Sequence, residues 1–197
     1  GSSVRSFVVV PVAINKISNF MDNDASYRLD LTVESVDHVT PAIVSLSSGL
    51  SFGEGGETIK IHGNNFDLGA RVFFGDIEAK IISISPNVVE VIIPGHDPGD
   101  VSVSVTNPSG IKSGGIGFRY FKRQDDGSLI RAIGDSRIFI TKGNYRRHIK
   151  DAKIFSFYGH LGFDKVKDVS WQELGLYKES DLIKSEHSPK VYSVDNT

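Results

Sequence analysis

The amino-acid sequence predicts a mainly β protein, with an antiparallel β-sandwich followed by a small α+β module. Three observations predict it. Short β-branched segments, each ending in Gly, Pro or Asn, follow one another at regular spacing between residues 42 and 120. Two alternating segments then flank Lys142-Gly143-Asn144, a strong β-hairpin signal. Finally, two helix-start signals follow, at Asp151 and at Ser170.

The strands of the predicted sandwich contain ordered motifs, namely "GGETIKIHGNNF", "GARVFFGD", "VEVIIPG" and "VSVSVTNPSG". In this order they resemble successive signatures of the IPT/TIG immunoglobulin-like domain. The resemblance implies an immunoglobulin-like β-sandwich over residues 41–121. Similar domains occur in surface proteins, in polysaccharide-active proteins and in transcription factors, so the resemblance leaves three classes of function open.

The glycines of "GGETIKIHGNNF" are predicted to shape the chain rather than to bind phosphate. A phosphate loop places its glycines between a strand and a helix, whereas Gly55 and Gly56 precede a strand. We expect Gly63, with Asn64 and Asn65, to supply a turn before the chain re-enters the core.

Motifs typical of enzymes and metal sites are incomplete in this sequence. Residues 49–53 match the G-x-S-x-G nucleophile elbow, but a strand rather than a helix follows, so Ser51 is expected to be a loop serine. The six histidines show no metal-binding spacing, and residues 22–26 lack the later ligands of a calcium loop. With no cysteine present, we predict a non-enzymatic protein without metal or cofactor.

Residues 127–197 are predicted to form the α+β module, with a β-hairpin and two short helices. Asp151 can cap the first helix, whose apolar face comprises Ile154, Phe157, Tyr158 and Leu161. Ser170 and Glu173 form a capping box for the second helix, in which Trp171 and Leu174 are expected to seal a small core.

This module also begins to repeat itself at an offset of 53 residues. Leu129-Ile130-Arg131 aligns with Leu182-Ile183-Lys184, and Arg137-Ile138-Phe139 aligns with Lys190-Val191-Tyr192. We therefore expect a truncated second copy from residue 180. The module resembles a repeat found in tandem at the ends of predicted bacterial surface proteins. If the end of the chain folds back, residues 182–194 would pair beside residues 129–140.

Residues 1–40 are predicted to be a β-strand extension. Its apolar strand contains Phe7, Val8, Val9, Val10, Val12 and Ile14. Such a strand must be covered, because an exposed one would promote aggregation. Two alternatives remain open: a hairpin that extends the first domain, or a donor strand that completes the sheet of a neighbouring subunit.

Charge differs between the two parts of the chain. Residues 1–120 contain 8 Lys and Arg against 13 Asp and Glu, a net charge of −5, whereas residues 121–197 contain 14 against 11, a net charge of +3. The change coincides with a predicted linker or turn at residues 121–127. The acidic first part argues against nucleic-acid binding. An exposed basic surface is predicted from Lys142, Arg146, Arg147, His148 and Lys150.

We therefore expect an extracellular structural or adhesive surface protein, with itself or an anionic cell-wall polymer as partner and no membrane insertion. A self-assembling filament or layer, formed by β-strand addition, is one form of this expectation. The alternative is a carbohydrate-binding accessory module, with Tyr145, Tyr158, Trp171 and Tyr177 forming an aromatic platform.

Overall fold

The computed structural model describes residues 39–151, 153, 162–180, 182–184 and 191–193. The chain divides into two units, residues 1–36 and residues 37–197, and the described residues belong to the second. The expected N-terminal strand, the calcium-like motif at residues 22–26 and the helix expected after Asp151 lie outside the described residues. Within the described residues, no helix is long and apolar enough to cross a membrane.

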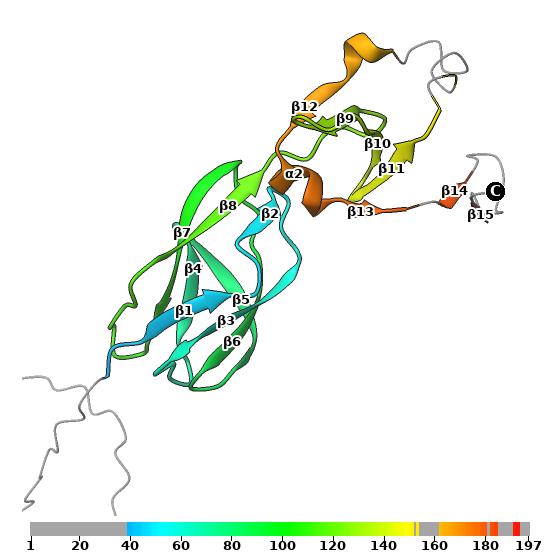
Figure 1. Cartoon of the computed structure of the whole chain (residues 1–197). Coiled ribbons are helices and arrows are strands. Elements are labelled where there is room, and N and C mark those ends of the chain that lie inside the picture. The colour runs from blue at the N-terminus through cyan, green and yellow to red at the C-terminus, as the bar shows by residue number, and fades with distance from the viewer. Residues whose placement is uncertain (1–38, 152, 154–161, 181, 185–190, 194–197) are drawn as a thin grey trace, which may run out of the picture. The chain divides into compact units, whose positions relative to one another are not determined.

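Residues 42–121 form a β-sandwich of eight strands (Figure 1). The strands are β1 (Ala42–Leu46), β2 (Leu50–Phe52), β3 (Thr58–Asn64), β4 (Arg71–Phe74), β5 (Ile77–Ile84), β6 (Val88–Ile92), β7 (Gly99–Thr106) and β8 (Ile116–Phe121). Their order is β1-β3-β6-β5-β4-β7-β8-β2. The first part of β5 pairs with β4 and its second part with β6, so β5 joins the two layers. This confirms the predicted mainly β, immunoglobulin-like fold.

The core of the sandwich follows from the alternation of its strands. In β3, Ile59 and Ile61 are buried, while Lys60 between them is exposed. On the opposite layer, the rings of Phe74 and Phe118 meet edge to face, with their centroids 5.0 Å apart. Each fully buried side chain of this size stabilises the fold by about 1.5–3 kcal/mol.

Gly63 lies inside β3 and is required there for close packing rather than for a turn. A Cβ at this position would clash with the Ala42 carbonyl oxygen and with the Phe66 ring. The positive φ expected in this stretch occurs at Asn65, at 60°, and Phe66 then returns to the core. The expected structural role of Gly63 is therefore right, but its placement in a turn is wrong.

The C-terminal module contains a second, five-stranded sheet within residues 129–179, in the order β12-β9-β10-β11-β13. Its strands are β9 (Leu129–Ala132), β10 (Ile138–Lys142), β11 (Tyr145–Ile149), β12 (Lys167–Val169) and β13 (Lys178–Glu179), and a 3-10 turn, η1 (Phe163–Lys165), precedes β12. Strands β9 to β11 are antiparallel, and the short edge strands β12 and β13 run parallel to their neighbours. The predicted hairpin is confirmed: Lys142 pairs with Tyr145 across a two-residue turn.

The predicted second helix is α2 (Trp171–Leu176), between β12 and β13. Its N-cap is Ser170, whose hydroxyl accepts a hydrogen bond from the Glu173 N–H at 3.0 Å, as the capping signal predicts. Leu174 is buried as expected. Trp171, however, is 56% exposed, so its expected place in the core is wrong. The space next to Leu174 is filled by Phe52 and Tyr177 instead.

Strands β14 (Leu182–Lys184) and β15 (Val191–Ser193) pair antiparallel in a two-stranded sheet of their own. A fold-back of residues 182–194 was predicted to pair them beside β9 and β10. This prediction is wrong, because β14 and β15 pair with each other and not with that sheet. The reason lies in the five-stranded sheet, where β9 is already flanked by β12 and β10, and β10 by β9 and β11.

Candidate functional site

The described residues place one concentrated set of contacts between the sandwich and the C-terminal module, and we call this set the junction. It begins at β2, which pairs parallel to β8 with Phe52 opposite Phe121. The Phe52 side chain is 3% exposed, although it lies in a strand at the edge of the sheet. It is buried in the core of the C-terminal module, together with Ile130, Ala132, Phe139, Val169, Leu174 and Tyr177.

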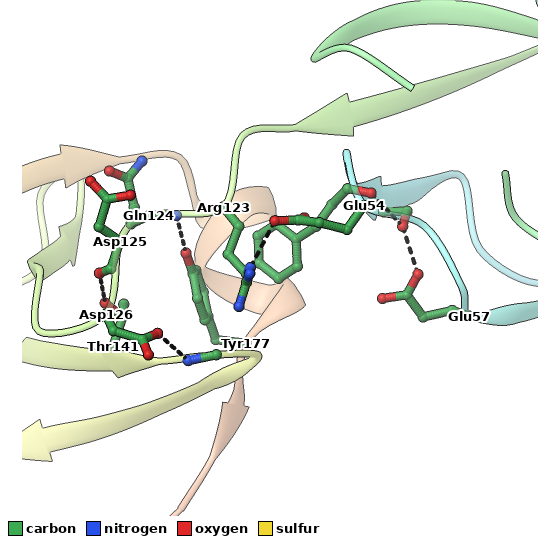
Figure 2. A network of polar contacts seen from close by, with 11 residues as sticks. Glu54, Glu57, Arg123, Gln124, Asp125, Asp126, Thr141 and Tyr177 are labelled. Atoms are coloured by element: carbon green, nitrogen blue, oxygen red, sulfur yellow. Dashed lines mark hydrogen bonds and ion pairs between the residues drawn. The ribbon is translucent and has the colours of Figure 1, made fainter. Parts of the chain in front are cut away.

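Tyr177 is the main partner of Phe52 at the junction. The two ring centroids are 4.7 Å apart and the rings are tilted by 59°. The Tyr177 hydroxyl accepts a hydrogen bond from the Gln124 N–H at 2.8 Å (Figure 2). Burial raises the pKa of Tyr177, since the ionised phenolate would lose its hydration there. Tyr177 therefore anchors the segment that leaves the sandwich to the far end of the C-terminal module.

The side chain of Gln124 extends this anchor. Its Nε2 donates to the Glu173 carboxylate of α2 at 2.9 Å, and its Oε1 accepts from Lys167 Nζ of β12 at 3.2 Å. Glu173 thus contributes twice, because its backbone N–H is capped by Ser170 while its carboxylate binds Gln124. One glutamine in the segment after β8 thus connects that segment to both β12 and α2.

An ion pair closes the sandwich side of the junction. The Arg123 Nε donates to Glu54 Oε1 at 2.9 Å, and both side chains are partly exposed (Figure 2). Burial alone would raise the pKa of Glu54, but the hydrogen bond and positive charge of Arg123, together with a backbone hydrogen bond, outweigh burial and hold this pKa below its usual value. Since exposed ion pairs contribute little, this pair orients the modules more than it stabilises them.

The predicted linker at residues 121–127 is a turn held by hydrogen bonds. Asp125 O accepts from Thr141 Oγ1 at 2.8 Å, and the Asp126 carboxylate accepts from the Gly143 N–H at 2.6 Å (Figure 2). The Gly143 hydrogen bond, followed by that of Lys142, lowers the pKa of Asp126. The turn is therefore tied to the β10–β11 hairpin, and only seven residues separate β8 from β9.

Ser51 is a strand residue and not the loop serine that we expected. It is 2% exposed in β2, and its hydroxyl donates to Glu57 Oε2 at 2.9 Å. His96, one of the six histidines, stacks on the Tyr120 ring, and its Nδ1 lies 2.7 Å from Asp97 O. No helix follows Ser51, so the nucleophile-elbow geometry does not form. Among the described residues, no cluster of His, Asp and Glu could hold a metal ion.

The structure gives the five residues of the predicted basic surface different environments. Arg146 donates to Leu174 O and lies over the Phe139 ring at 4.8 Å, and its side chain is only 18% exposed. His148 contacts the same ring. Lys142 pairs with Asp126 at 3.2 Å, whereas Arg147 is half-buried and Lys150 is exposed. Arg146 and His148 thus support the module core, and a binding role of the remaining residues stays a prediction.

The aromatic residues of the predicted platform are also divided. Tyr145 is 50% exposed and Trp171 is 56% exposed, but Tyr177 is 2% exposed and cannot contact a ligand. Tyr158 lies outside the described residues, as do Phe7, Val8, Val9, Val10, Val12 and Ile14 of the predicted assembly strand. Sequence reasoning missed the junction roles of Phe52, Gln124 and Tyr177. The sequence carried a local signal only for Ser170, the N-cap of α2. The junction contacts themselves join distant parts of the chain, so no local pattern indicates them.

The sandwich has the strand order and packing described above, and comparison with known families identifies it. The family model of the IPT/TIG domain matches residues 41–120. Residues 41–120 form an IPT/TIG domain. The resemblance inferred from the strand motifs is therefore confirmed, and the junction joins an IPT/TIG domain to the C-terminal module. The resemblance of the C-terminal module to a repeat of bacterial surface proteins stays a prediction.

Individual relatives share only part of this chain. The human "Recombining binding protein suppressor of hairless-like protein" is 39% identical over 62 residues, which are 30% of this chain and 12% of that protein. Its mouse counterpart is 41% identical over 58 residues, 28% of this chain and 11% of that protein. The chain thus spans about an eighth of the curated relatives it matches.

Two solved structures are among those similar to this chain. One is the γ-CGTase of alkalophilic Bacillus clarkii, with 22% identity, a TM-score of 0.41, and coverage of 49% of this chain and 14% of that one. Another is the TIG domain of human nuclear factor of activated T-cells, cytoplasmic 4, with 19% identity, a TM-score of 0.40, and coverage of 46% and 95%.

Proposed function

We propose that this chain is a non-enzymatic structural or adhesive protein of the bacterial cell surface, in which the IPT/TIG domain and the C-terminal module act together as one stiff spacer. The observation that supports this proposal most is the position of Phe52, a sandwich residue buried in the core of the C-terminal module. A spacer needs its modules held at a fixed angle, and a shared core holds them more firmly than a surface contact.

The strength of the junction can be estimated from its parts. Burial of a phenylalanine side chain contributes about 1.5–3 kcal/mol. The contact of its ring with Tyr177 adds about 0.5–1.5 kcal/mol. The hydrogen bond from Gln124 N–H to Tyr177 adds about 1 kcal/mol. Together these contributions are large enough to keep two modules docked most of the time.

Spin-label distance measurements test the spacer. The chain has no cysteine, so Lys60→Cys in the IPT/TIG domain and Ser136→Cys in the C-terminal module would be the only labelled sites. Both positions are exposed. We expect one narrow distance distribution in the full chain, and a broader one when Phe52→Ala is added. Leu68→Ala, at an exposed position of the same domain, is the matched control and should leave the distribution narrow. A broad distribution in the unchanged junction would overturn the spacer.

Assembly and location belong to the same proposal. The partner would be another copy of the chain or an anionic cell-wall polymer, and the predicted donor strand is at residues 6–14. Light scattering over a range of concentrations tests self-assembly. We expect a mass above the monomer, and a folded monomer after deletion of residues 1–14. A monomer at every concentration would reject assembly without affecting the spacer.

A second candidate function, carbohydrate binding, is favoured by the exposure of Trp171 and Tyr145. Exposed aromatic rings suit stacking on sugars, and Trp171 is the single tryptophan of the chain. A soluble polysaccharide that binds there should change the tryptophan fluorescence, and Tyr145→Ala should weaken the response if both rings contact the ligand. Retention of the protein on an insoluble form of the same polysaccharide gives a second measurement. An unchanged fluorescence spectrum together with no retention would exclude this function.

A further inference from the structure

The hairpin of β14 and β15 has the same register as the hairpin of β9 and β10. Ile130 lies opposite Phe139 in the first, and Ile183 lies opposite Tyr192 in the second. Each residue of the second pair comes 53 positions after its counterpart, the offset at which the sequence repeats. The neighbouring pairs agree in the same way: Leu129 with Ile140, and Leu182 with Ser193. The agreement concerns the pairing register of the backbone and not only the residue types. A slip by one residue would destroy it, because it would exchange the two faces of a strand.

The first hairpin shows what covers a hairpin of this register. Ile130 and Phe139 are fully buried. The layer that covers them comes from later in the same module and includes Val169, Leu174 and Tyr177, with Phe52 added from the IPT/TIG domain. A two-stranded hairpin is marginally stable in water by itself, so it needs such a layer.

The segments that lead into the two hairpins also correspond. Lys178 and Glu179 precede β14 at the same distance as Asp125 and Asp126 precede β9. Asp125 and Asp126 are tied to the first module by hydrogen bonds, and Lys178 and Glu179 form β13, which pairs with β11. The second hairpin therefore follows the first module as directly as the first module follows the IPT/TIG domain.

We propose that the hairpin of β14 and β15 is the docking site for a polypeptide segment of the same kind as residues 145–180. Such a segment supplies a basic strand, two short edge strands, a capped helix and a buried tyrosine, the parts that complete the first module. At the offset of 53, Thr197 corresponds to Asn144, so the counterparts of β11, β12, α2 and β13 are not among residues 1–197. The docking builds on the proposed spacer and would extend it into a linear array of modules.

An extended chain tests the proposal. A copy of residues 145–180 is joined directly after Thr197, which places every added residue at the offset of the repeat. Hydrogen exchange of the backbone amides in residues 182–184 and 191–193 is then compared with that of the unextended protein. We expect exchange at least about tenfold slower in the extended chain, because the added segment closes a core over the hairpin.

Two control variants separate docking from mere added length. In one, the added counterparts of Leu174 and Tyr177 are both serine, which removes the apolar cover. In the other, one glycine is inserted after Thr197, which shifts the added strand by one residue. Both controls should exchange like the unextended protein. If the extended chain also exchanges like the unextended protein, or if the controls are slowed as much as it is, the proposal fails. The spin-label distance between positions 60 and 136 reports the spacer separately, so either proposal can fail alone.

Discussion

The ring centroids of Phe52 and Tyr177 lie 4.7 Å apart, although the two residues are distant in the sequence. Phe52 belongs to β2 of the IPT/TIG domain, and Tyr177 follows α2 of the C-terminal module. Both are almost completely buried. The contact makes the C-terminal module dependent on the domain before it, since part of its core is supplied from outside its own sequence.

Phe52→Ala should therefore destabilise the C-terminal module strongly. Loss of a buried phenylalanine costs about 3–5 kcal/mol, because it leaves a cavity as well as lost apolar contact. Urea unfolding followed by the fluorescence of Trp171 measures the loss, since the single tryptophan lies in this module. Leu68→Ala, at a side chain that is 87% exposed, is expected to change the stability by less than about 0.5 kcal/mol. Equal effects of the two changes would show that Phe52 is not shared.

Tyr177 should make the protein less stable at alkaline pH. Burial raises its pKa in the folded protein, whereas an unfolded tyrosine has a pKa of about 10. Below that pH both states are protonated and the full stability is present. As the pH rises further, the unfolded state loses its proton first, so the free energy of unfolding falls. Tyr120, whose pKa is also raised by burial, contributes in the same direction.

Tyr177→Phe isolates this contribution. The variant should lose about 0.5–1.5 kcal/mol at neutral pH, because the Gln124 N–H loses its acceptor. Its stability should then fall less steeply than that of the unchanged protein between pH 9 and pH 11, with the remaining slope due to Tyr120. The urea midpoint at each pH provides the measurement. Parallel slopes would mean that Tyr177 is not buried in solution.

Gly63 and Gly117 offer a matched pair of strand glycines within the IPT/TIG domain. A Cβ at Gly63 would clash with the Ala42 carbonyl oxygen and the Phe66 ring, whereas a Cβ at Gly117 meets no atom within 4 Å. Gly63→Ala should cost about 1–3 kcal/mol through overpacking. Gly117→Ala should be neutral, or stabilising by up to about 1 kcal/mol, because glycine is unfavourable inside a strand. Thermal unfolding of the two variants compares them directly.

Features determined by neighbouring residues could be predicted from the sequence, and these examples show why. The alternation of β3 places Ile59 and Ile61 in the core whatever the rest of the chain does. Similarly, Gly143 supplies the positive φ of a two-residue turn, and Ser170 caps α2 through an atom three residues away.

The junction could not be predicted in this way, because its contacts join residues that are distant in the sequence. Nothing near Phe52 indicates that its ring enters another module, and the sequence predicted a loop at its neighbour Ser51. Tyr177 follows a short helix, where an exposed aromatic residue is equally reasonable. The exposure of Trp171 has the same origin: Phe52 and Tyr177 occupy the core beside Leu174, and neither was assigned to that core from the sequence.

The two apolar residues of α2 give the last prediction. Leu174 is 1% exposed beside Phe52 and Tyr177, whereas Trp171 at the start of the same helix is 56% exposed. Leu174→Ala should lower the free energy of unfolding by about 2–5 kcal/mol through the cavity it leaves. Trp171→Ala should lower it by less than about 1 kcal/mol, although more atoms are removed, since most of the indole is already in water. Because Trp171→Ala removes the fluorescence signal, circular dichroism follows urea unfolding in both variants. If Trp171→Ala is the more damaging change, the indole is packed in solution, and the sequence-based placement of Trp171 in the core is right after all.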